Sequence, residues 1–229
     1  MKRLQHAVIL LLGLSMAMMA SCTKDPDNGG GNNGGNNGGG NNGNTYNGHE
    51  YVDLGLPSGT LWATCNVGAT TPEGYGDYFA WGETSPRISG MWYDYKWFGN
   101  YDDDNIILTK YNDDDSLNTL LPEDDAATAN WGNGWCTPTV DQWKELYQYV
   151  NSTGTIQNGV FGRLFASNNG RSLFLPATDL DNSEIGQYWS SSLYYNEFAW
   201  GFDFSAPLYF TERHFRCWEY SVRPVRSTH

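Results

Sequence analysis

The sequence predicts a mixed α+β domain with short antiparallel strands, one clear helix, one short helix and long loops. Two observations favour this class. Short runs of alternating apolar residues are separated by turn signals, such as those at 57–59 and 168–170. Only one segment, beginning at Thr139, repeats apolar residues at helical spacing. No internal repeat of fixed period occurs, so we expect a single domain.

Residues 1–21 have the pattern of an export signal. Lys2 and Arg3 precede an apolar stretch over 7–20 that is too short to span a bilayer comfortably. The stretch ends in Met19-Ala20-Ser21-Cys22, which resembles a bacterial lipobox, and Cys22 would then be lipidated. The alternative is an ordinary cleaved signal that ends near a cysteine. Lipidation would anchor the chain to a membrane without spanning it, which predicts an outer-membrane lipoprotein exposed at the cell surface.

Residues 22–46 are predicted to form a tether and residues 47–229 the domain. The tether is mostly Gly and Asn, a composition that cannot bury enough apolar surface to offset its chain entropy. The chain carries a formal net charge of −13, which repels nucleic acids and anionic lipids. We therefore expect no nucleic-acid partner, and contact with a membrane only through the lipid.

In the first half of the domain, alternation predicts a hairpin over 51–56 and 60–64. Residues 74–82 indicate an ordered loop or short strand, and 83–121 form a long polar region expected to consist of loops. A short helical turn is expected at 122–127, where acidic residues suit a helix start.

The second half begins with the clear helix. Thr139 and Gln142 have capping-box spacing, and apolar residues recur at helical intervals up to Val150. Asn151 and Gly154 are expected to end it. The remaining residues predict strands, listed in chain order as a hairpin over 159–166 and 172–175 and three strands at 188–192, 198–204 and 219–225.

Many ordered motifs of the domain resemble the Fibrobacter succinogenes major paralogous domain. They are YVDLGLPSGTLWA at 51–63, YFAWGET at 78–84, PEDDAA at 122–127, NWG at 130–132, PT at 138–139, NGV at 158–160, FLPA at 174–177, YWSS at 188–191 and SVRPVR at 221–226. That family is abundant in surface lipoproteins of gut Bacteroidetes-type bacteria and is similar in fold to C-type lectins. The resemblance implies pairing of the N- and C-terminal strands, two helices and a long loop region. The chain departs from the family at Glu219, where glycine is expected, and at Cys136, where arginine is expected.

The aromatic C-terminal segment is the predicted binding site. Variable proteins of diversity-generating retroelements share the implied fold, and residues 194–220 lie where their variable region would lie. Phe198, Trp200, Phe202 and Phe204 alternate as one strand face and are predicted to be core. The residues around them are expected in turns that contact a protein or glycan on another surface, since Tyr, Trp and Arg dominate contact energies at interfaces. The predicted ligand-binding residues are Tyr194, Tyr195, Asn196, Glu197, Leu208, Tyr209, Thr211, Glu212, Arg213, His214, Phe215, Arg216, Trp218 and Glu219.

The sequence predicts no metal site, no cofactor and no catalytic residues. The acidic runs at 102–104 and 113–115 lack the spacing of a calcium loop, and few histidines are present. Formylglycine-generating enzymes share the implied fold but depend on a reactive cysteine pair, for which Cys217 is the one candidate. Cys65 and Cys136 are expected to be small buried residues. Besides that enzyme class, a tip subunit of a surface fibre is the other alternative to a binding protein.

Overall fold

The computed structural model describes residues 44–103, 105–179, 184–205 and 208–227. The predicted signal peptide, Cys22 and the tether up to residue 43 lie outside the described residues. Residues 44–46, predicted as the end of the tether, instead form a strand, β1, that pairs with β2 (His49–Asp53) through the register Thr45↔Glu50. Within these limits, no helix is long and apolar enough to cross a membrane.

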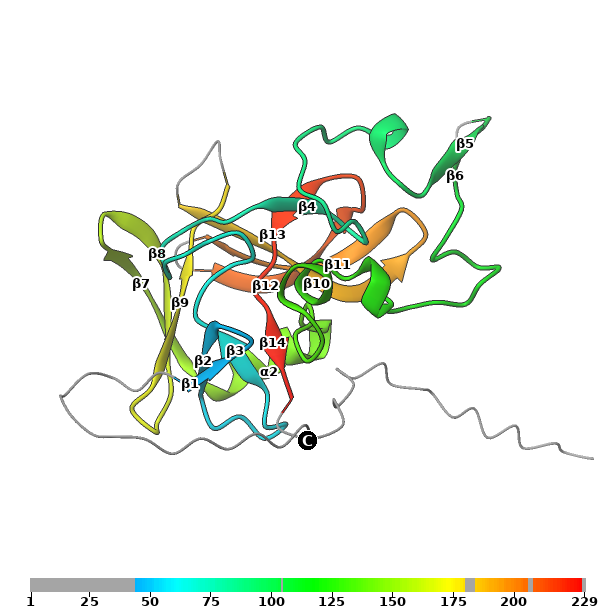
Figure 1. Ribbon diagram of the computed structural model, residues 1–229. Coiled ribbons are helices and arrows are strands. Elements are labelled where there is room, and N and C mark those ends of the chain that lie inside the picture. The colour runs from blue at the N-terminus through cyan, green and yellow to red at the C-terminus, as the bar shows by residue number, and fades with distance from the viewer. Residues whose placement is uncertain (1–43, 104, 180–183, 206–207, 228–229) are drawn as a thin grey trace, which may run out of the picture.

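Most ordered elements are strands, arranged in four sheets (Figure 1). The N-terminal sheet has the order β1 (Asn44–Tyr46), β2 (His49–Asp53), β3 (Leu61–Ala63) and β14 (Val225–Arg226). The central sheet has the order β12 (Leu208–Phe215), β11 (Phe198–Ser205), β10 (Ile185–Tyr195), β13 (Glu219–Ser221) and β4 (Tyr78–Ala80). A third sheet joins β7 (Asn151–Gln157), β8 (Val160–Ala166) and β9 (Ser172–Pro176), and a two-stranded one joins β5 (Phe98–Asp102) and β6 (Asn105–Leu108).

The helices are few, as a mixed α+β fold predicts. They are the 3-10 turns η1 (Trp92–Asp94) and η2 (Pro122–Asp124) and the α-helices α1 (Ala126–Trp131) and α2 (Val140–Tyr149). The predicted capping box of α2 is confirmed, because Thr139 accepts from the Gln142 backbone and Gln142 bonds back to the Thr139 backbone. The short helix predicted at 122–127 is also present, as η2 followed by α1, whose N-terminus is capped by Asp125.

Several strand predictions are confirmed, and one strand, β7, was not predicted. The hairpins β2–β3 and β8–β9 pair antiparallel as expected. Helix α2 ends at Tyr149, just before Asn151 as predicted, but Asn151 begins β7 and Gly154 lies within that strand. β7 pairs with β8 along its whole length because Asn158 and Gly159 turn the chain with φ values of 49° and 85°. Two consecutive positive φ values are what a tight hairpin turn requires.

The predicted strand over 219–225 is two strands in different sheets. β13 lies in the central sheet beside β10 and β4, whereas β14 pairs with β3 through Val225↔Trp62. The first and last strands of the described chain therefore share one sheet. Figure 1 shows β14, in red, beside the blue and cyan N-terminal strands.

Trp143 of α2 is the centre of the main core. Its ring stacks on Phe202 at 4.6 Å and lies 4.6 Å from the ring of Trp62, and its indole nitrogen donates to the Trp189 carbonyl at 3.2 Å. Phe202 and Phe204 are fully buried, as predicted, but Phe198 and Trp200 are only half-buried. The prediction that these four residues are all core is thus wrong for Phe198 and Trp200, which lie beyond the part of the strand that α2 covers.

The polar region 83–121 contains ordered structure, contrary to the expectation of loops alone. It carries η1 and the β5–β6 hairpin, which stands away from the rest of the domain in Figure 1. Asp124 of η2 holds the region by ion pairs with Lys96 and Lys110, and it accepts a hydrogen bond from the Tyr111 hydroxyl at 2.8 Å. Burial alone would raise the pKa of Asp124, but the hydrogen bonds from Lys110, Lys96 and Tyr111 outweigh it and lower that pKa.

The Asp124→Asn variant is expected to be less stable at neutral pH by about 1–2 kcal/mol, because it removes charge-assisted hydrogen bonds from a buried site. A lowered folded-state pKa gives stabilisation that is present above the unfolded value of about 3.9 and lost as the pH falls through the folded value. The stability difference from the parent protein should therefore shrink below about pH 4. Urea unfolding at several pH values measures it.

Glu123→Gln is the matched control, since Glu123 neighbours Asp124 but its side chain is 65% exposed. It should change the free energy of unfolding by no more than about 0.5 kcal/mol at any pH. A pH-independent loss in Asp124→Asn would contradict the charge argument.

Candidate functional site

The strand pair β11–β12 presents a row of aromatic side chains beyond the end of the core. Phe198 lies opposite Phe215, and Trp200 lies opposite Arg213. Because side chains alternate with period two along a strand, these four lie on one face in two adjacent rows. The same face is buried further along, at Phe202 and Phe204, where α2 covers it.

We call the Trp200–Arg213 pair the outer row. Tyr194, at the end of β10, lies beside both of its side chains. Its ring meets Trp200 edge-on at 4.9 Å, and its hydroxyl accepts a hydrogen bond of 3.2 Å from Arg213. The Arg213 guanidinium also lies 5.3 Å from the centre of the Tyr194 ring. Packed edge-on and hydrogen-bonded in this way, the three side chains form a preorganised surface of the kind that dominates contact energies at interfaces.

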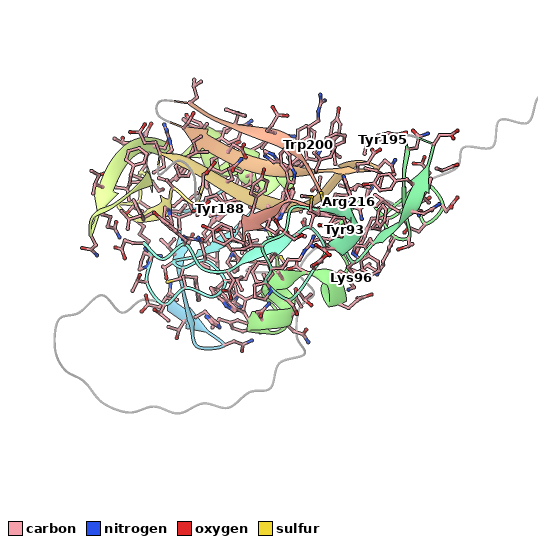
Figure 2. The ribbon with its side chains drawn as sticks, turned by 90° about the horizontal axis from the view of Figure 1, so that it is seen from above. Tyr93, Lys96, Tyr188, Tyr195, Trp200 and Arg216 are labelled. Atoms are coloured by element: carbon pink, nitrogen blue, oxygen red, sulfur yellow. The ribbon has the colours of Figure 1, made fainter. Side chains whose placement is uncertain are left out.

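The Phe198–Phe215 pair forms the inner row, and it contacts side chains from segments that lie far apart in the sequence. Phe215 stacks on Phe198 at 4.5 Å and meets Trp218 at 5.3 Å and Trp92 of η1 at 6.0 Å. We call the whole set the aromatic face: Trp92, Tyr194, Phe198, Trp200, Arg213, Phe215 and Trp218. In Figure 2, Trp200 and Tyr195 lie toward the border of the domain and Arg216 lies inward of them.

The sequence interpretation missed the contribution of η1. Met91 and Tyr93 flank Trp92, and Tyr93 is 70% exposed. The signal was available, because Met91-Trp92-Tyr93 is an apolar triplet within an otherwise polar region. Its place beside Phe215 was not predictable, since the contact joins residues more than a hundred positions apart.

The predicted binding residues are divided between surface and interior. β12 is a continuous strand rather than a turn, so its side chains alternate between two faces, with Tyr209, Thr211, Arg213 and Phe215 on one and Leu208, Glu212 and His214 on the other. The exposed members of the predicted set are Tyr194, Tyr195, Leu208, Glu212, Arg213 and Trp218. The half-buried members are Asn196, Glu197, Tyr209, Thr211, Phe215 and Glu219. The buried members are His214 and Arg216, so the expectation that these two face a ligand is corrected.

Arg216 is fully buried and bonds only within the domain. Its guanidinium donates to the carbonyl oxygens of Lys110, Tyr111 and Asn196, each at 3.0 Å, and to the Tyr95 hydroxyl at 3.0 Å. It thereby ties the 83–121 region and the turn at 194–197 to the end of β12. Arg216 positions the aromatic face without being part of it.

Glu219, another of the predicted ligand-binding residues, is half-buried and has a structural role. Its carboxylate accepts hydrogen bonds from the backbone nitrogens of Ser89 and Gly90, all at 3.0 Å, and lies 3.4 Å from the Arg87 guanidinium. This carboxylate therefore fixes the segment before η1 against β13, and that segment supplies Trp92 to the aromatic face.

His214 belongs to a buried polar chain on the opposite face of β12. Its Nε2 lies 2.8 Å from Asp203 and its Nδ1 lies 3.1 Å from the Tyr220 hydroxyl. Gly201 makes room for the ring, because a Cβ there would lie 2.8 Å from the His214 ring. Both ring nitrogens of His214 therefore have a hydrogen-bond partner within the domain.

The chemistry available to the cysteines is limited. Cys65 and Cys217 are free thiols, and Cys217 is 1% exposed. Burial raises the pKa of Cys217 to about 12, so its reactive thiolate form is scarce at neutral pH. Among the described residues, no group of three or more His, Cys, Asp or Glu side chains could hold a metal ion.

Comparisons of this chain with protein-family models, with curated proteins and with solved structures found no match. The interpretation of the site therefore depends on its own geometry.

The Arg216→Lys variant is expected to lose about 3 kcal/mol of stability, because one ammonium cannot reach four acceptors that the planar guanidinium bonds together. Hydrogen exchange should also accelerate at residues 194–197, where the Asn196 carbonyl loses its donor. Urea unfolding and exchange mass spectrometry measure the two effects. Arg213→Lys, an exposed substitution of the same kind, should stay within about 0.5 kcal/mol of the parent protein. If Arg216→Lys and Arg213→Lys changed the free energy of unfolding and the exchange rates equally, Arg216 would not be the residue that positions the aromatic face.

Cys217 should resist alkylation by iodoacetamide at pH 8 in the folded protein, since the thiolate is the reactive form and the thiol is buried. Peptide mass spectrometry after limited labelling measures it, and the same reaction in denaturant is the control in which Cys217 becomes labelled. Labelling of the folded protein at the rate of an exposed thiol would restore the formylglycine-generating alternative.

Proposed function

We propose that this chain is a non-catalytic binding lipoprotein with a C-type-lectin-like fold, which presents the aromatic face to a protein or glycan on another surface. Cys22 is the proposed lipidation site, and the outer-membrane surface is the proposed location. The tether would let the domain reach a partner without inserting into the membrane.

The architecture supports the proposed fold. The resemblance noted in the sequence implies paired terminal strands, two helices and a long loop region. β3 and β14 pair, α1 and α2 are the two α-helices described, and residues 83–121 lead out to the β5–β6 hairpin and back.

The aromatic face carries the proposal, because it combines exposed contact groups with a rigid base. Tyr194 and Trp218 are each 42% exposed while their rings remain packed against neighbours. Binding costs less when side chains are already held in place, since little rotamer entropy is then lost. Buried Arg216 and half-buried Glu219 fix the segments from which these side chains extend.

The arrangement also supports a role for residues 194–220 as a retroelement-diversified segment, which we include in the proposal. Its exposed positions, such as Tyr195 and Arg213, alternate with the internal positions His214 and Arg216. Diversified codons would be expected at the former and fixed codons at the latter.

The test needs a ligand, which a screen of the full chain against a glycan array and a panel of purified surface proteins can supply. For the ligand found, Arg213→Ala and Trp218→Ala should each weaken binding by about 30-fold or more, since central Arg and Trp contacts contribute about 2 kcal/mol or more. Biolayer interferometry measures the affinities.

Ile156→Ala is the matched control, because Ile156 is 69% exposed and lies on β7, outside the aromatic face. It should leave the affinity unchanged within about twofold, as expected for a surface change away from the contact. If the ligand binds equally well after all the exposed residues of the face are replaced by Ala or Ser, the proposal is wrong.

A further inference from the structure

β12 forms one edge of the central sheet and is long for an edge strand. It runs over eight residues, and among the described residues β11 is the strand that pairs with it. β4, at the other edge of the sheet, has three residues. Edge strands present unpaired N–H and C=O groups to which another strand can add.

Two hydrogen bonds show which backbone groups of β12 face away from β11. The Arg216 N–H donates to the Glu197 carbonyl at 2.9 Å, which continues the β11–β12 ladder by one residue pair. In an antiparallel ladder, pairs that exchange hydrogen bonds alternate with pairs that do not, so every second residue of β12 directs its N–H and C=O groups outward. Those outward residues are Tyr209, Thr211 and Arg213. The Arg213 N–H agrees with this assignment, since it donates to the Glu212 side chain at 2.9 Å.

Few features protect this edge from a second strand. β12 pairs with β11 without a register shift and contains neither proline nor lysine, which are usual means of protecting an edge. Leu208 and Phe210 are 62% and 41% exposed. The Glu212 carboxylate shields the edge by occupying the Arg213 N–H, but this contact joins neighbouring residues and a competing main-chain acceptor can replace it.

We propose that β12 pairs antiparallel with β12 of a second copy of this chain, which joins the two central sheets into one. A two-fold axis relates the two chains of most homodimers. Residues directly opposite each other in an antiparallel pair share a face, so an axis perpendicular to the sheet passes at a residue and not between two residues. The centres near the middle of the strand are Phe210, Thr211 and Glu212.

The pairing is most favourable when the axis passes at Thr211. Arg213 then lies opposite the neutral Tyr209 of the second copy, and Glu212 lies opposite the apolar Phe210. Each outward residue exchanges both hydrogen bonds with an outward residue of the second copy, about six bonds in all. A centre at Glu212 would oppose two carboxylates, which is destabilising, and a centre at Phe210 would give fewer bonds between outward residues.

The pairing would place two aromatic faces on one side of a continuous sheet, because opposed residues share a face and Arg213 belongs to the aromatic face. Two copies of a site held side by side bind a repeated partner more tightly than one copy does. The pairing itself does not depend on the proposed function, since backbone groups of β12 make it.

Sedimentation velocity of the full chain over a wide concentration range tests the proposal. The fraction of dimer should rise with concentration. It should also rise with salt, because each copy carries a formal net charge of −13 and salt screens the repulsion between the copies. Raising NaCl from about 0.05 M to about 0.5 M should tighten the association by about threefold or more. A chain that stays monomeric at the highest concentration in both salts would overturn the proposal.

Amide hydrogen exchange, followed residue by residue by NMR, identifies the surface used. The amides of Tyr209, Thr211 and Arg213 should exchange more slowly as dimer forms, because the second strand then accepts their hydrogen bonds. The amides of Phe210 and Glu212 already bond to β11 and should change little. If the chain dimerises but the three outward amides gain no protection, the dimer uses another surface and the proposal is wrong.

A pair of substitutions at Phe210 tests the register. Phe210→Glu places a carboxylate opposite Glu212 of the second copy, whereas Phe210→Lys places an ammonium there. The Glu variant should dimerise about tenfold or more weakly than the Lys variant, because like charges directly opposite destabilise a strand pair and opposite charges stabilise it.

The same two substitutions at Ile156, which is 69% exposed on β7, are the matched control, since they change the net charge by the same amounts. They should differ from each other by no more than about twofold in dimerisation. Equal differences at the two positions would contradict the proposed register. Trp218→Ala, which should weaken ligand binding at the aromatic face, should leave dimerisation unchanged, so each of the two proposals can fail without the other.

Discussion

The candidate binding surface depends on the hydrogen bonds that the Arg216 guanidinium group makes. A fully buried cation without a carboxylate partner is costly, and it persists only when hydrogen bonds and polarisable neighbours replace its water. Three carbonyls and one hydroxyl do this for Arg216, and its guanidinium lies 4.9 Å from the centre of the Trp81 ring and 5.4 Å from that of Tyr95. Because the three carbonyls belong to the 83–121 region and the turn after β10, one side chain fixes both borders of the aromatic face.

Arg223, beyond the opposite end of β13, is a second buried arginine that binds backbone carbonyls. It donates to the Asn66 side chain at 2.7 Å and to the carbonyls of Ala63, Thr64 and Phe174, and burial lowers its pKa. The short segment between Arg216 and Arg223 thus joins the long loop region, the N-terminal sheet and the β7–β9 sheet. The described part of the fold has two short α-helices and many connecting segments, and these two arginines link its parts through hydrogen bonds to backbone carbonyls.

Features determined by neighbouring residues were predictable from the sequence, and features determined by distant contacts were not. The capping box of α2 and the hairpins β2–β3 and β8–β9 follow from short-range signals and are confirmed. β7 has an unremarkable polar sequence and exists because β8 pairs with it. The burial of His214 and Arg216 contradicts the usual exposure of their residue types, and only the positions of Asp203, Tyr95 and Asn196 explain it. That the segment binds a ligand stays a prediction, and its division into exposed side chains and buried support required the structure.

The alternation of exposed and buried side chains over residues 213–218 affects which positions of the surface can be substituted. Along β12 and the following turn, exposed Arg213 precedes buried His214, half-buried Phe215 precedes buried Arg216, and buried Cys217 precedes exposed Trp218. The side chains that hold the fold and those that face solvent therefore alternate within one short stretch, and the two sets meet where the His214 ring lies 6.3 Å from that of Trp218. Substitutions at non-contacting sites contribute to stability nearly independently, so exposed positions can vary while the internal hydrogen bonds of His214 and Arg216 stay intact. A surface built in this way can change its exposed side chains without losing its scaffold.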